Sequence, residues 1–309
     1  MAAAMTRFAI VTGCSQTSIG FLAARQLAEK GYRVILACRS DASGNAAQEL
    51  IGGESKYLKL DLGSFQSIHS FAKQARDLDG FSGSLQLLVC NAGIAWSDDR
   101  KETTDGLEEI VGVNHVGHFL LLQLLLPDFC TGDAAPTPRV VHVASSLHHV
   151  KDKDKQSDKE LLPHFPDGII ANEQQEFNSM MAYRISKLCN IWTTYELRKR
   201  HPHIETAAVS PGFIPTTGLA RNAGFVAQFM IRFVLNPLQS IGLGPGTTPE
   251  NGAAVIVQAS TKELPAEGTG YFHLEKGEFV PIRSSDESYD TSKSEKLWDL
   301  SMQWCKLSS

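Results

Sequence analysis

The chain has 309 residues, of which 42% are hydrophobic and 20% charged, and its formal net charge at pH 7 is −5. This composition is typical of a globular protein and excludes a disordered or fibrous chain. Lys and Arg number 29 against 34 Asp and Glu, and they form no basic block that could follow a phosphate backbone. Nucleic acid is therefore not expected as a partner.

Six cysteines are spread along the chain without a Cys-x-x-Cys pair. Such thiols are typical of a reducing compartment, so we expect the cytoplasm or an organelle stroma or matrix. The first residues lack the charged and apolar regions of a secretory signal. The longest apolar run, 119–129, is interrupted by Gln123 and Pro127 and is shorter than the roughly 20 residues of a membrane span. It predicts a buried helix in a soluble or peripherally membrane-associated protein.

From Phe8 onward, short apolar runs alternate with stretches of helical periodicity. The continuous apolar character of the runs indicates a sheet that helices cover on both faces. The predicted fold class is therefore α/β, a doubly wound parallel sheet. The predicted strands span residues 8–11, 32–37, 57–60, 85–90, 139–144 and 204–210, and the predicted helices span residues 19–30, 45–51, 65–78, 106–126 and 179–200.

No linker-like segment or internal repeat divides the chain, so residues 1–309 are predicted to form one domain. Two insertions interrupt the alternation, at residues 147–177 and 217–248. Both follow strands at the edge where ligands bind in such sheets. We therefore expect both insertions near the active site.

The first predicted strand ends at Thr12-Gly13, and small or polar residues continue to Ser18, before a helix begins near Gly20. Free N–H groups and the dipole at a helix start favour a pyrophosphate, which is what dinucleotide binding requires. A glycine before a helix is also often only a tight turn. The loop alone leaves both interpretations open.

The second predicted strand is followed by Arg39, at a place where NAD-dependent enzymes tend to carry a carboxylate for the ribose 2′-hydroxyl. A guanidinium suits a 2′-phosphate, so Arg39 favours NADP(H) over NAD(H). The alternative is a surface arginine paired with nearby Asp41. Asp61-Leu62 and Asn91-Ala92-Gly93 follow the next two strands at the same edge, and together they outline a cofactor trough.

Tyr183 and Lys187 lie four residues apart on a predicted helix, and therefore on one face. A free phenol has a pKa of about 10, and a neighbouring ammonium favours the phenolate that acid–base chemistry near pH 7 needs. The alternative is a packed tyrosine beside a surface lysine. Ser145, after a strand, and Asn114, on an earlier helix, support the first interpretation only if the fold brings all four together.

The order of these motifs is itself informative. They resemble the short-chain dehydrogenase/reductase family over nearly the full length of the chain. The resemblance implies a single Rossmann-type domain with about seven parallel strands, in which Asn114, Ser145, Tyr183 and Lys187 form a catalytic tetrad. The motifs are Thr12-Gly13 to Gly20, Asp61-Leu62, Asn91-Ala92-Gly93, Asn114, Ser145, Tyr183-x-x-x-Lys187 and Pro211-Gly212.

In that family the serine positions the substrate carbonyl, the tyrosine gives or takes the proton, the lysine binds the ribose and assists the tyrosine, and the asparagine holds a water relay. Ser145, rather than Ser146, occupies the family's register. The segment 211–216 resembles the part of the family that surrounds the nicotinamide and phosphates. The cofactor-binding residues implied are Gly13, Ser15, Ser18, Ile19, Arg39, Asp61, Leu62, Asn91, Ala92, Gly93, Tyr183, Lys187, Pro211, Gly212, Ile214 and Thr216.

A closer resemblance is to the branch that holds retinol dehydrogenases and light-dependent protochlorophyllide oxidoreductases. Two residues depart from the family patterns. Ser18 replaces the middle glycine of a loop that is one residue longer than usual, which is expected to alter backbone approach to the pyrophosphate and to weaken cofactor affinity. Phe213 stands where the protochlorophyllide enzymes carry a cysteine implicated in pigment reduction, and phenylalanine cannot donate a proton. The branch motifs are 88–93, 114–120, 183–190, 216–219 and Leu297-Trp298.

The predicted function is hydride transfer between NADP(H) and a carbonyl or alcohol of a lipophilic small molecule, with Tyr183 as proton donor or acceptor. Substrate contacts are expected from Phe213, Phe225 and Phe229. The apolar run 225–235 is interpreted as a lid, a membrane-surface contact or core. Two alternatives stay open: light-dependent reduction of a protochlorophyllide C=C bond, and a catalytically silent NADP(H)-binding scaffold.

No metal site is expected, because His115, His118 and the pair His148-His149 lack acidic or cysteine partners at a metal-binding spacing. Family members commonly pair through two long helices, here residues 114–126 and 179–200. The resemblance therefore leaves a homodimer and a monomer open.

Overall fold

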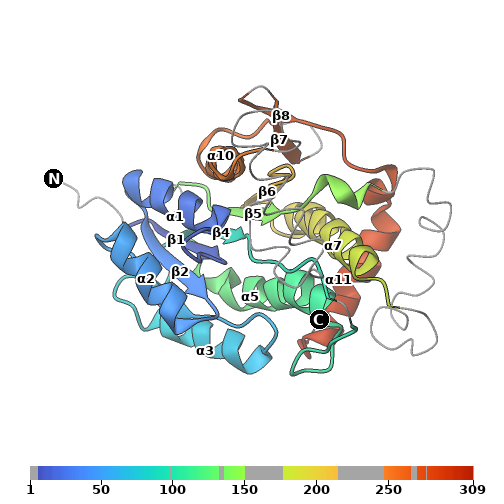
Figure 1. Ribbon diagram of the computed structural model, residues 1–309, viewed down its shortest axis with the longest axis horizontal. Helices are drawn as coiled ribbons and strands as arrows, with labels where there is room; N and C mark the ends of the chain where they lie inside the picture. Colours follow the sequence, from blue (N-terminus) through green and yellow to red (C-terminus); the bar gives the residue numbers. More distant parts are fainter. Residues whose placement is uncertain are drawn as a thin grey trace, which may run out of the picture.

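The structure is a computed structural model that describes residues 6–97, 99–131, 136–149, 177–214, 247–265, 270–275 and 277–308. Within these residues the strands form one eight-stranded sheet, in the order β3-β2-β1-β4-β5-β6-β7-β8. Helices cover both faces of the sheet (Figure 1). The chain is an α/β protein with a Rossmann-like sheet, as its alternating sequence predicts.

The first seven strands are parallel, and β8 adds an antiparallel edge that the prediction of about seven parallel strands did not include. Gly277, with a φ of 86°, turns the chain between β7 and β8 in a conformation that favours glycine. Strand β8 is short, half exposed and ends in a proline, so it carries no strand signal of its own. The strands are β1 (Phe8–Thr12), β2 (Arg33–Cys38), β3 (Lys56–Lys59), β4 (Leu85–Cys90), β5 (Arg139–Val143), β6 (Glu205–Val209), β7 (Tyr271–Glu275) and β8 (Glu278–Pro281).

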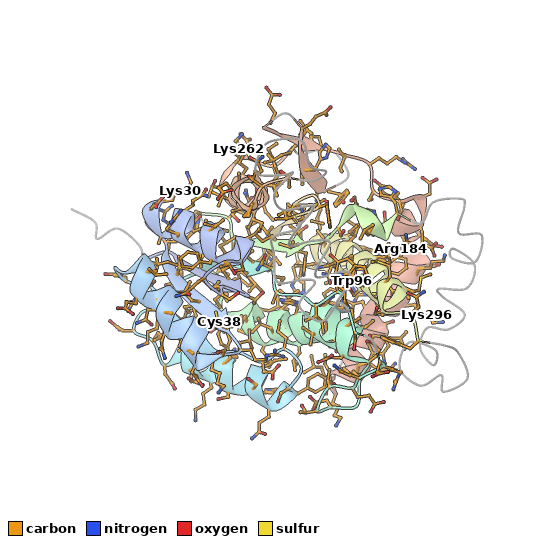
Figure 2. All side chains as sticks on the ribbon, in the orientation of Figure 1. Lys30, Cys38, Trp96, Arg184, Lys262 and Lys296 are labelled. Carbon is orange, nitrogen blue, oxygen red and sulfur yellow. The ribbon has the colours of Figure 1, made fainter. Side chains whose placement is uncertain are left out.

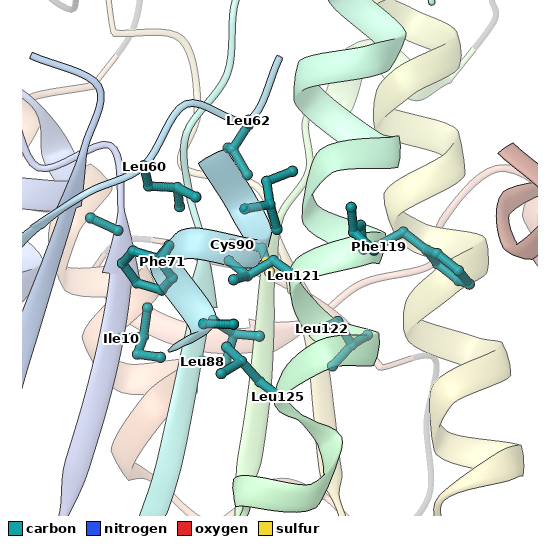
Figure 3. Packing of buried hydrophobic residues seen from close by; sticks show 14 of the residues in the cluster. Ile10, Leu60, Leu62, Phe71, Leu88, Cys90, Phe119, Leu121, Leu122 and Leu125 are labelled. Carbon is teal, nitrogen blue, oxygen red and sulfur yellow. The ribbon is translucent and has the colours of Figure 1, made fainter. Parts of the chain in front are cut away.

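The sheet separates two hydrophobic cores, because successive side chains of a strand point to opposite faces. In β1, Phe8 and Ile10 belong to one core, and Ala9 and Val11 belong to the other. Figure 3 shows part of the first core, where helical side chains meet those of the strands. The helices on the first face are α3 (Phe65–Arg76), α5 (Gly117–Leu125) and α7 (Ser179–Arg200), and those on the second are α1 (Ile19–Glu29), α2 (Asp41–Ile51) and α10 (Pro249–Thr261).

The predicted helix over residues 106–126 is interrupted by a π-helical turn. The segment consists of α4 (Glu109–Val111), the π turn η1 (Gly112–Val116), α5 and the short 3₁₀ turn η2 (Leu126–Asp128). A π turn inserts one extra residue into a helix, and such turns are frequent at functional sites. Residues Glu109–Asp128 have the length and hydropathy of a membrane span, but 72% of the most apolar window is buried inside the protein. This helical segment forms part of the core.

The last helix, α11 (Thr291–Trp304), lies against α7 (Figure 1). Trp298 of α11 packs edge-on against Phe119 of α5, with ring centroids 4.9 Å apart. Leu297 joins a buried cluster with Ile185 and Trp192 of α7. Helix α7 is one of the two helices through which the resemblance implied pairing of two copies of the chain. Helix α11 of the same chain already covers this part of α7. Two short 3₁₀ turns, η3 (Ser146–His148) and η6 (Asp286–Tyr289), complete the described elements.

Candidate active site

Tyr183, Lys187 and Ser145 meet at the carboxyl edge of the sheet. Ser145, two residues beyond β5, faces the phenol of Tyr183, and its hydroxyl acts to lower the pKa of that phenol. The Lys187 ammonium donates to the carbonyl oxygen of Val143 over 2.7 Å and lies 5.5 Å from the centroid of the Tyr183 ring. The fold therefore brings together three side chains that the sequence places on two separate elements.

Burial acts on the two titratable groups in opposite directions. Desolvation raises the pKa of Tyr183 to about 12, against a smaller lowering by the Ser145 hydroxyl. Desolvation lowers the pKa of Lys187 to about 8. The sequence analysis expected the ammonium to favour the phenolate, and the structure corrects this, since desolvation outweighs any such effect. At neutral pH the phenol carries its proton.

Asn114, the fourth residue of the implied tetrad, lies in the π turn and is fully buried. Its amide nitrogen donates to Ile94 O over 2.8 Å and to the Ser186 hydroxyl over 3.0 Å, and its Oδ1 accepts from Ile94 N–H. A Cβ added to Gly93 would lie 3.2 Å from Asn114 Oδ1 and 3.5 Å from Lys187 Nζ. Asn114 and Lys187 thus flank Gly93 closely enough to leave little room for a side chain there.

The loop after β1 is shaped by its glycines. Gly13 has a φ of 75°, and its N–H donates to Ala37 O over 2.8 Å. A Cβ at Gly13 would meet Ala92 Cα at 2.9 Å, and one at Gly20 would meet the Asn91 amide at 2.4 Å. Both glycines are therefore required by the close packing of the loop against the end of β4.

Ser18 has an ordinary extended conformation, with φ −88° and ψ 155°, and it caps helix α1. Its hydroxyl accepts from Phe21 N–H over 3.1 Å and donates to Gly13 O over 2.7 Å. Ser18 N–H donates to Ser15 O. The serine at the middle glycine position therefore closes the loop upon itself and occupies one N–H group of the helix start.

Thr12 joins the ends of β1 and β4. Its hydroxyl oxygen accepts from the N–H groups of Asn91 and Ala92, each over 2.9 Å. The Asn91 amide nitrogen donates to Thr12 O over 2.7 Å, while its Oδ1 is buried without a partner among the described residues. An unpaired acceptor beside a cradle too tight for a Cβ fits a bound group that supplies a donor.

Arg39 is exposed, and within the described part of the chain its guanidinium has no hydrogen-bond or ion-pair partner. The alternative partner, Asp41, instead accepts from Lys59 Nζ and from the Tyr57 hydroxyl, each over 2.8 Å. The pairing of Arg39 with Asp41 is therefore wrong, and Arg39 is left available at the carboxyl end of β2.

Three residues implied as cofactor contacts bury their side chains in the cores. Leu62 belongs to the first core, and Ile19 and Ile214 to the second. Any contact they make with a cofactor falls to their backbone.

Asp61 accepts from Gly63 N–H over 3.0 Å. Pro211 and Gly212 follow β6 at the same edge, and a Cβ at Gly212 would meet Thr247 at 2.9 Å; Thr216, Phe225 and Phe229 lie outside the described residues.

Large apolar side chains gather on the loops at this edge. Of the four exposed ones in the described ranges, Trp96, Leu147 and Phe213 follow β4, β5 and β6 respectively, and Phe213 is 56% exposed. Trp96 is labelled in Figure 2. Tyr183 and Ala95 belong to the same small buried cluster in this region. The sequence analysis named Phe213 but not Trp96 or Leu147, because isolated apolar residues in loops have no periodicity.

The histidines considered as metal ligands are engaged elsewhere. His115 Nε2 lies 2.8 Å from the Ser301 hydroxyl, and His118 contacts Thr12 and the backbone of Asn114. His148 Nδ1 lies 2.6 Å from Ser145 O, and its Nε2 accepts from Ser285 N–H. The contacts of His118 escaped sequence reasoning, although its spacing of four residues from Asn114 was a usable signal.

Comparison with known proteins identifies the family of this site. A family model for the short chain dehydrogenases matches residues 7–154. Over 95% of its length the chain is 33% identical to the chloroplastic protochlorophyllide reductase B of Hordeum vulgare, of which it covers 77%. It is 31% identical over 94% of its length to the protochlorophyllide reductase of Avena sativa, of which it covers 97%. The chain belongs to the short-chain dehydrogenase/reductase family.

As a short-chain dehydrogenase, the protein is an oxidoreductase of a family that uses nicotinamide cofactors. Solved structures share its fold. A putative uncharacterized protein from Mycobacterium paratuberculosis superposes with a TM-score of 0.70 at 28% identity, covering 97% of this chain and 94% of that one. Salutaridine reductase from Papaver somniferum, at 23% identity and a TM-score of 0.59, covers 86% of this chain and 99% of its own, and this likeness concerns the fold alone.

Proposed function

We propose that this short-chain dehydrogenase is an NADP(H)-dependent reductase that transfers hydride to the carbonyl of a lipophilic small molecule, with Tyr183 supplying the proton. The observation that carries the proposal is the convergence of the Tyr183 phenol, the Ser145 hydroxyl and the Lys187 ammonium at one edge of the sheet. A hydroxyl that positions a carbonyl and a phenol that protonates it are the groups that carbonyl reduction needs.

The protonation of the site supports the direction of reduction. With its pKa raised to about 12, the phenol is a proton donor at neutral pH, and the Ser145 hydroxyl lies beside it. Lys187, with its pKa lowered to about 8, still carries its charge at pH 7. A cation beside the phenol stabilises the phenolate that remains after the proton has moved.

The cofactor preference rests on Arg39 and the loop after β1. Bound NADP(H) would supply the hydride, while Gly13, the start of α1 and Lys187 would hold its phosphates and ribose. The unpaired guanidinium of Arg39 suits a 2′-phosphate, and the pairing of Asp41 with Lys59 leaves it free for that role.

The substrate class rests on the apolar loops. Three exposed apolar residues lie in the loops that follow three adjacent strands, at the edge of the sheet that holds Tyr183. They are Trp96, Leu147 and Phe213. Exposed apolar groups around a polar reacting centre suit a substrate with a large apolar surface. Phe225 and Phe229 remain proposed contacts on the basis of sequence. The chloroplastic Hordeum relative supports an organelle as the compartment, and the buried free thiols agree with a reducing one.

A second candidate, reduction of a tetrapyrrole C=C bond in light, is favoured by the names of the Hordeum and Avena relatives. The residue that disfavours it is Phe213, which has no proton to give. Illumination of the protein with protochlorophyllide and NADPH separates the two candidates. Formation of chlorophyllide would support the second, and its absence, together with turnover of ketones in the dark, would leave the first.

The proposed function is tested on a panel of lipophilic ketones and aldehydes with NADPH and with NADH. We expect turnover with NADPH, and we expect Tyr183→Phe to bind NADPH normally while losing at least about a hundredfold of turnover. Tyr195→Phe is the matched control, because it removes a tyrosine hydroxyl from the same helix. That hydroxyl hydrogen bonds to Ser284 and not to the site. Near-normal turnover in Tyr183→Phe would remove the tyrosine from its role, and NADPH binding without turnover of any compound would favour a scaffold.

A further inference from the structure

A chain of buried hydrogen bonds connects the end of β1 to the turn of α7 that carries Tyr183. Its members are Thr12, His118, Asn114 and Ser186, none of which is more than 1% exposed. Thr12 Oγ1 lies 2.9 Å from His118 Nε2, and His118 Nδ1 lies 3.1 Å from Asn114 O. The Asn114 amide donates to Ser186 Oγ over 3.0 Å, and Ser186 Oγ donates to Tyr183 O over 2.7 Å.

The chemistry of the partners fixes the hydrogens at His118. A carbonyl oxygen only accepts, so the hydrogen of the neutral imidazole must lie on Nδ1, facing Asn114 O. Nε2 is then an acceptor, and Thr12 donates its hydroxyl hydrogen to it. The Thr12 oxygen keeps both lone pairs for the N–H groups of Asn91 and Ala92. The Thr12 hydroxyl could instead donate to Val89 O, but that oxygen lies 3.3 Å away, farther than His118 Nε2.

The chain is equally determined at its other end. With its amide oriented to satisfy its neighbours, Asn190 donates to Asn114 O over 3.1 Å, beside the bond from His118. Ser186 accepts from the Asn114 amide and gives its single hydrogen to the backbone of Tyr183. Each buried donor in the chain has one acceptor. A protonated His118 would point a second hydrogen, on Nε2, at Thr12 Oγ1, which has no lone pair left.

We propose that His118 is a positioning residue: its neutral imidazole, protonated at Nδ1, holds the trough at Asn91-Ala92-Gly93 and the π turn at Asn114 in register with α7. The proposal rests on the proposed hydride transfer, because the register matters only if the trough holds a nicotinamide beside Tyr183. His118 touches neither of the reacting partners. It acts through Thr12 and Asn114, which come from the two sides of the site.

Burial keeps His118 neutral over the working range. Desolvation lowers its pKa to about 4, and the neighbouring Lys187 cation acts in the same direction, against a smaller raising by the bond to Asn114 O. His115, on the π turn, is held neutral in the same way, with its pKa lowered to about 3. The tautomer required by the hydrogen-bond chain is therefore expected from pH 5 to pH 8.

Two substitutions test the two halves of the contact separately. In His118→Gln the amide oxygen can still accept from Thr12, but the donor to Asn114 is lost. In Thr12→Val the imidazole remains and its acceptor is left without a donor, and the N–H groups of Asn91 and Ala92 also lose the hydroxyl oxygen that accepts from them. We expect each to lower kcat at saturating NADPH and substrate by about tenfold or more, with NADPH affinity changed less than threefold. The double variant Thr12→Val/His118→Leu is compared with the two single variants. We expect its kcat to be no lower than that of the slower single variant, because each substitution alone already breaks the connection between Thr12 and Asn114.

His142→Leu is the control for a merely structural effect. His142 is as buried as His118 and also contacts a threonine, with Nδ1 3.0 Å from Thr194 Oγ1, but it lies outside the chain of bonds. We expect its loss to lower the melting temperature and to leave kcat and KM within threefold. Equal losses of kcat in His142→Leu and His118→Leu would overturn the proposal.

A readout without turnover separates this proposal from the proposed function. In ¹⁵N-histidine-labelled protein, long-range ¹H–¹⁵N spectra distinguish the two neutral tautomers and the charged form. We expect His118 to be neutral with its hydrogen on Nδ1 from pH 5 to pH 8, and to lose this signature in Thr12→Val. A hydrogen on Nε2, or titration within that range, would overturn the proposal even if the enzyme reduces ketones. The expected tautomer without turnover of any carbonyl would count against the proposed function alone.

Discussion

Burial moves the pKa values of Tyr183 and Lys187 apart, so the phenol is neutral and the amine charged at pH 7. Two titratable groups whose environments separate them in this way can divide acid–base work between them. In the proposed reaction the phenol would give the proton, and the ammonium would stabilise the charge that then appears. The protonation states support a reductase at neutral pH.

A pH profile of kcat tests this division of roles. We expect reduction at saturating NADPH to slow as the pH rises through about 8, because Lys187 then loses the charge that stabilises the phenolate. In Lys187→Arg the inflection should move beyond pH 10, whatever the residual rate, since a guanidinium stays charged. A profile of the wild-type enzyme that is flat to pH 10 would show that this charge is not needed.

Arg39 allows a second test at the residue scale. We expect Arg39→Asp to raise the dissociation constant of NADPH at least tenfold and to shift the preference toward NADH, because a carboxylate repels the 2′-phosphate and can bind a 2′-hydroxyl. Arg25→Asp is the control, since it makes the same charge change on the second half of α1, where Arg25 faces Glu29. Isothermal titration measures both. An unchanged NADPH affinity in Arg39→Asp would refute the assignment.

At the scale of elements, the sequence predicted best where an element is continuous and apolar. The bounds of β4 and α7 match the predictions, and the strands around β1 match within one or two residues. Helix α2 begins four residues earlier than predicted, because Ser40 caps it and its first turn is polar. The prediction gave no residue ranges for α10, β7, β8 or α11, whose sequences are short or mixed and whose burial depends on contacts far away in the chain.

The site followed the same rule. Tyr183 and Lys187 could be paired from their spacing on one helix, and the ends of the strands marked the edge where ligands bind. Their burial could not be predicted, and it reversed the expected direction for the pKa of the phenol. The π turn at Asn114 was also invisible, since its sequence has the periodicity of an ordinary helix.

Helix α11 is expected to stabilise the whole first face. Trp298 is 6% exposed, packs against Phe119 and lies under the Arg200 guanidinium, 4.9 Å from the ring centroid. We expect Trp298→Ala to lower the free energy of unfolding by about 3 kcal/mol, measured by urea titration. The control is Leu50→Ala, which removes a side chain that is 60% exposed and should change stability by less than about 0.5 kcal/mol. Equal effects would mean that α11 does not contribute to the core.

At the scale of the whole molecule, one face of the sheet buries three neutral imidazoles. His115, His118 and His142 have pKa values lowered to about 3, 4 and 3, in each case mainly by desolvation. Each has a hydroxyl partner, on Ser301, Thr12 and Thr194 respectively. The contacts of His118 and His142 tie α5 and α7 to the sheet, and the contact of His115 ties the π turn η1 to α11.

These imidazoles predict how stability depends on pH. Between pH 6.5 and 5 the unfolded chain binds protons that the folded chain does not, so the free energy of unfolding falls as the pH falls. The loss should be about 2 kcal/mol for each imidazole over this range. Urea titrations at pH 7, 6 and 5 measure it, and His142→Leu should remove the contribution of one imidazole, about 2 kcal/mol. Stability that is constant from pH 7 to pH 5 would contradict the burial of neutral rings.

The central claim is that hydride passes directly from the nicotinamide to a carbonyl carbon beside Tyr183. Its most direct test uses NADPH carrying deuterium at C4, with mass spectrometry of the alcohol formed from a lipophilic ketone. NADPH is labelled separately at each of the two C4 hydrogens. We predict that the product gains one deuterium from one of these two labelled forms, and that Tyr183→Phe slows this transfer at least about a hundredfold. A product without deuterium from either form, or unchanged transfer in Tyr183→Phe, would contradict the claim.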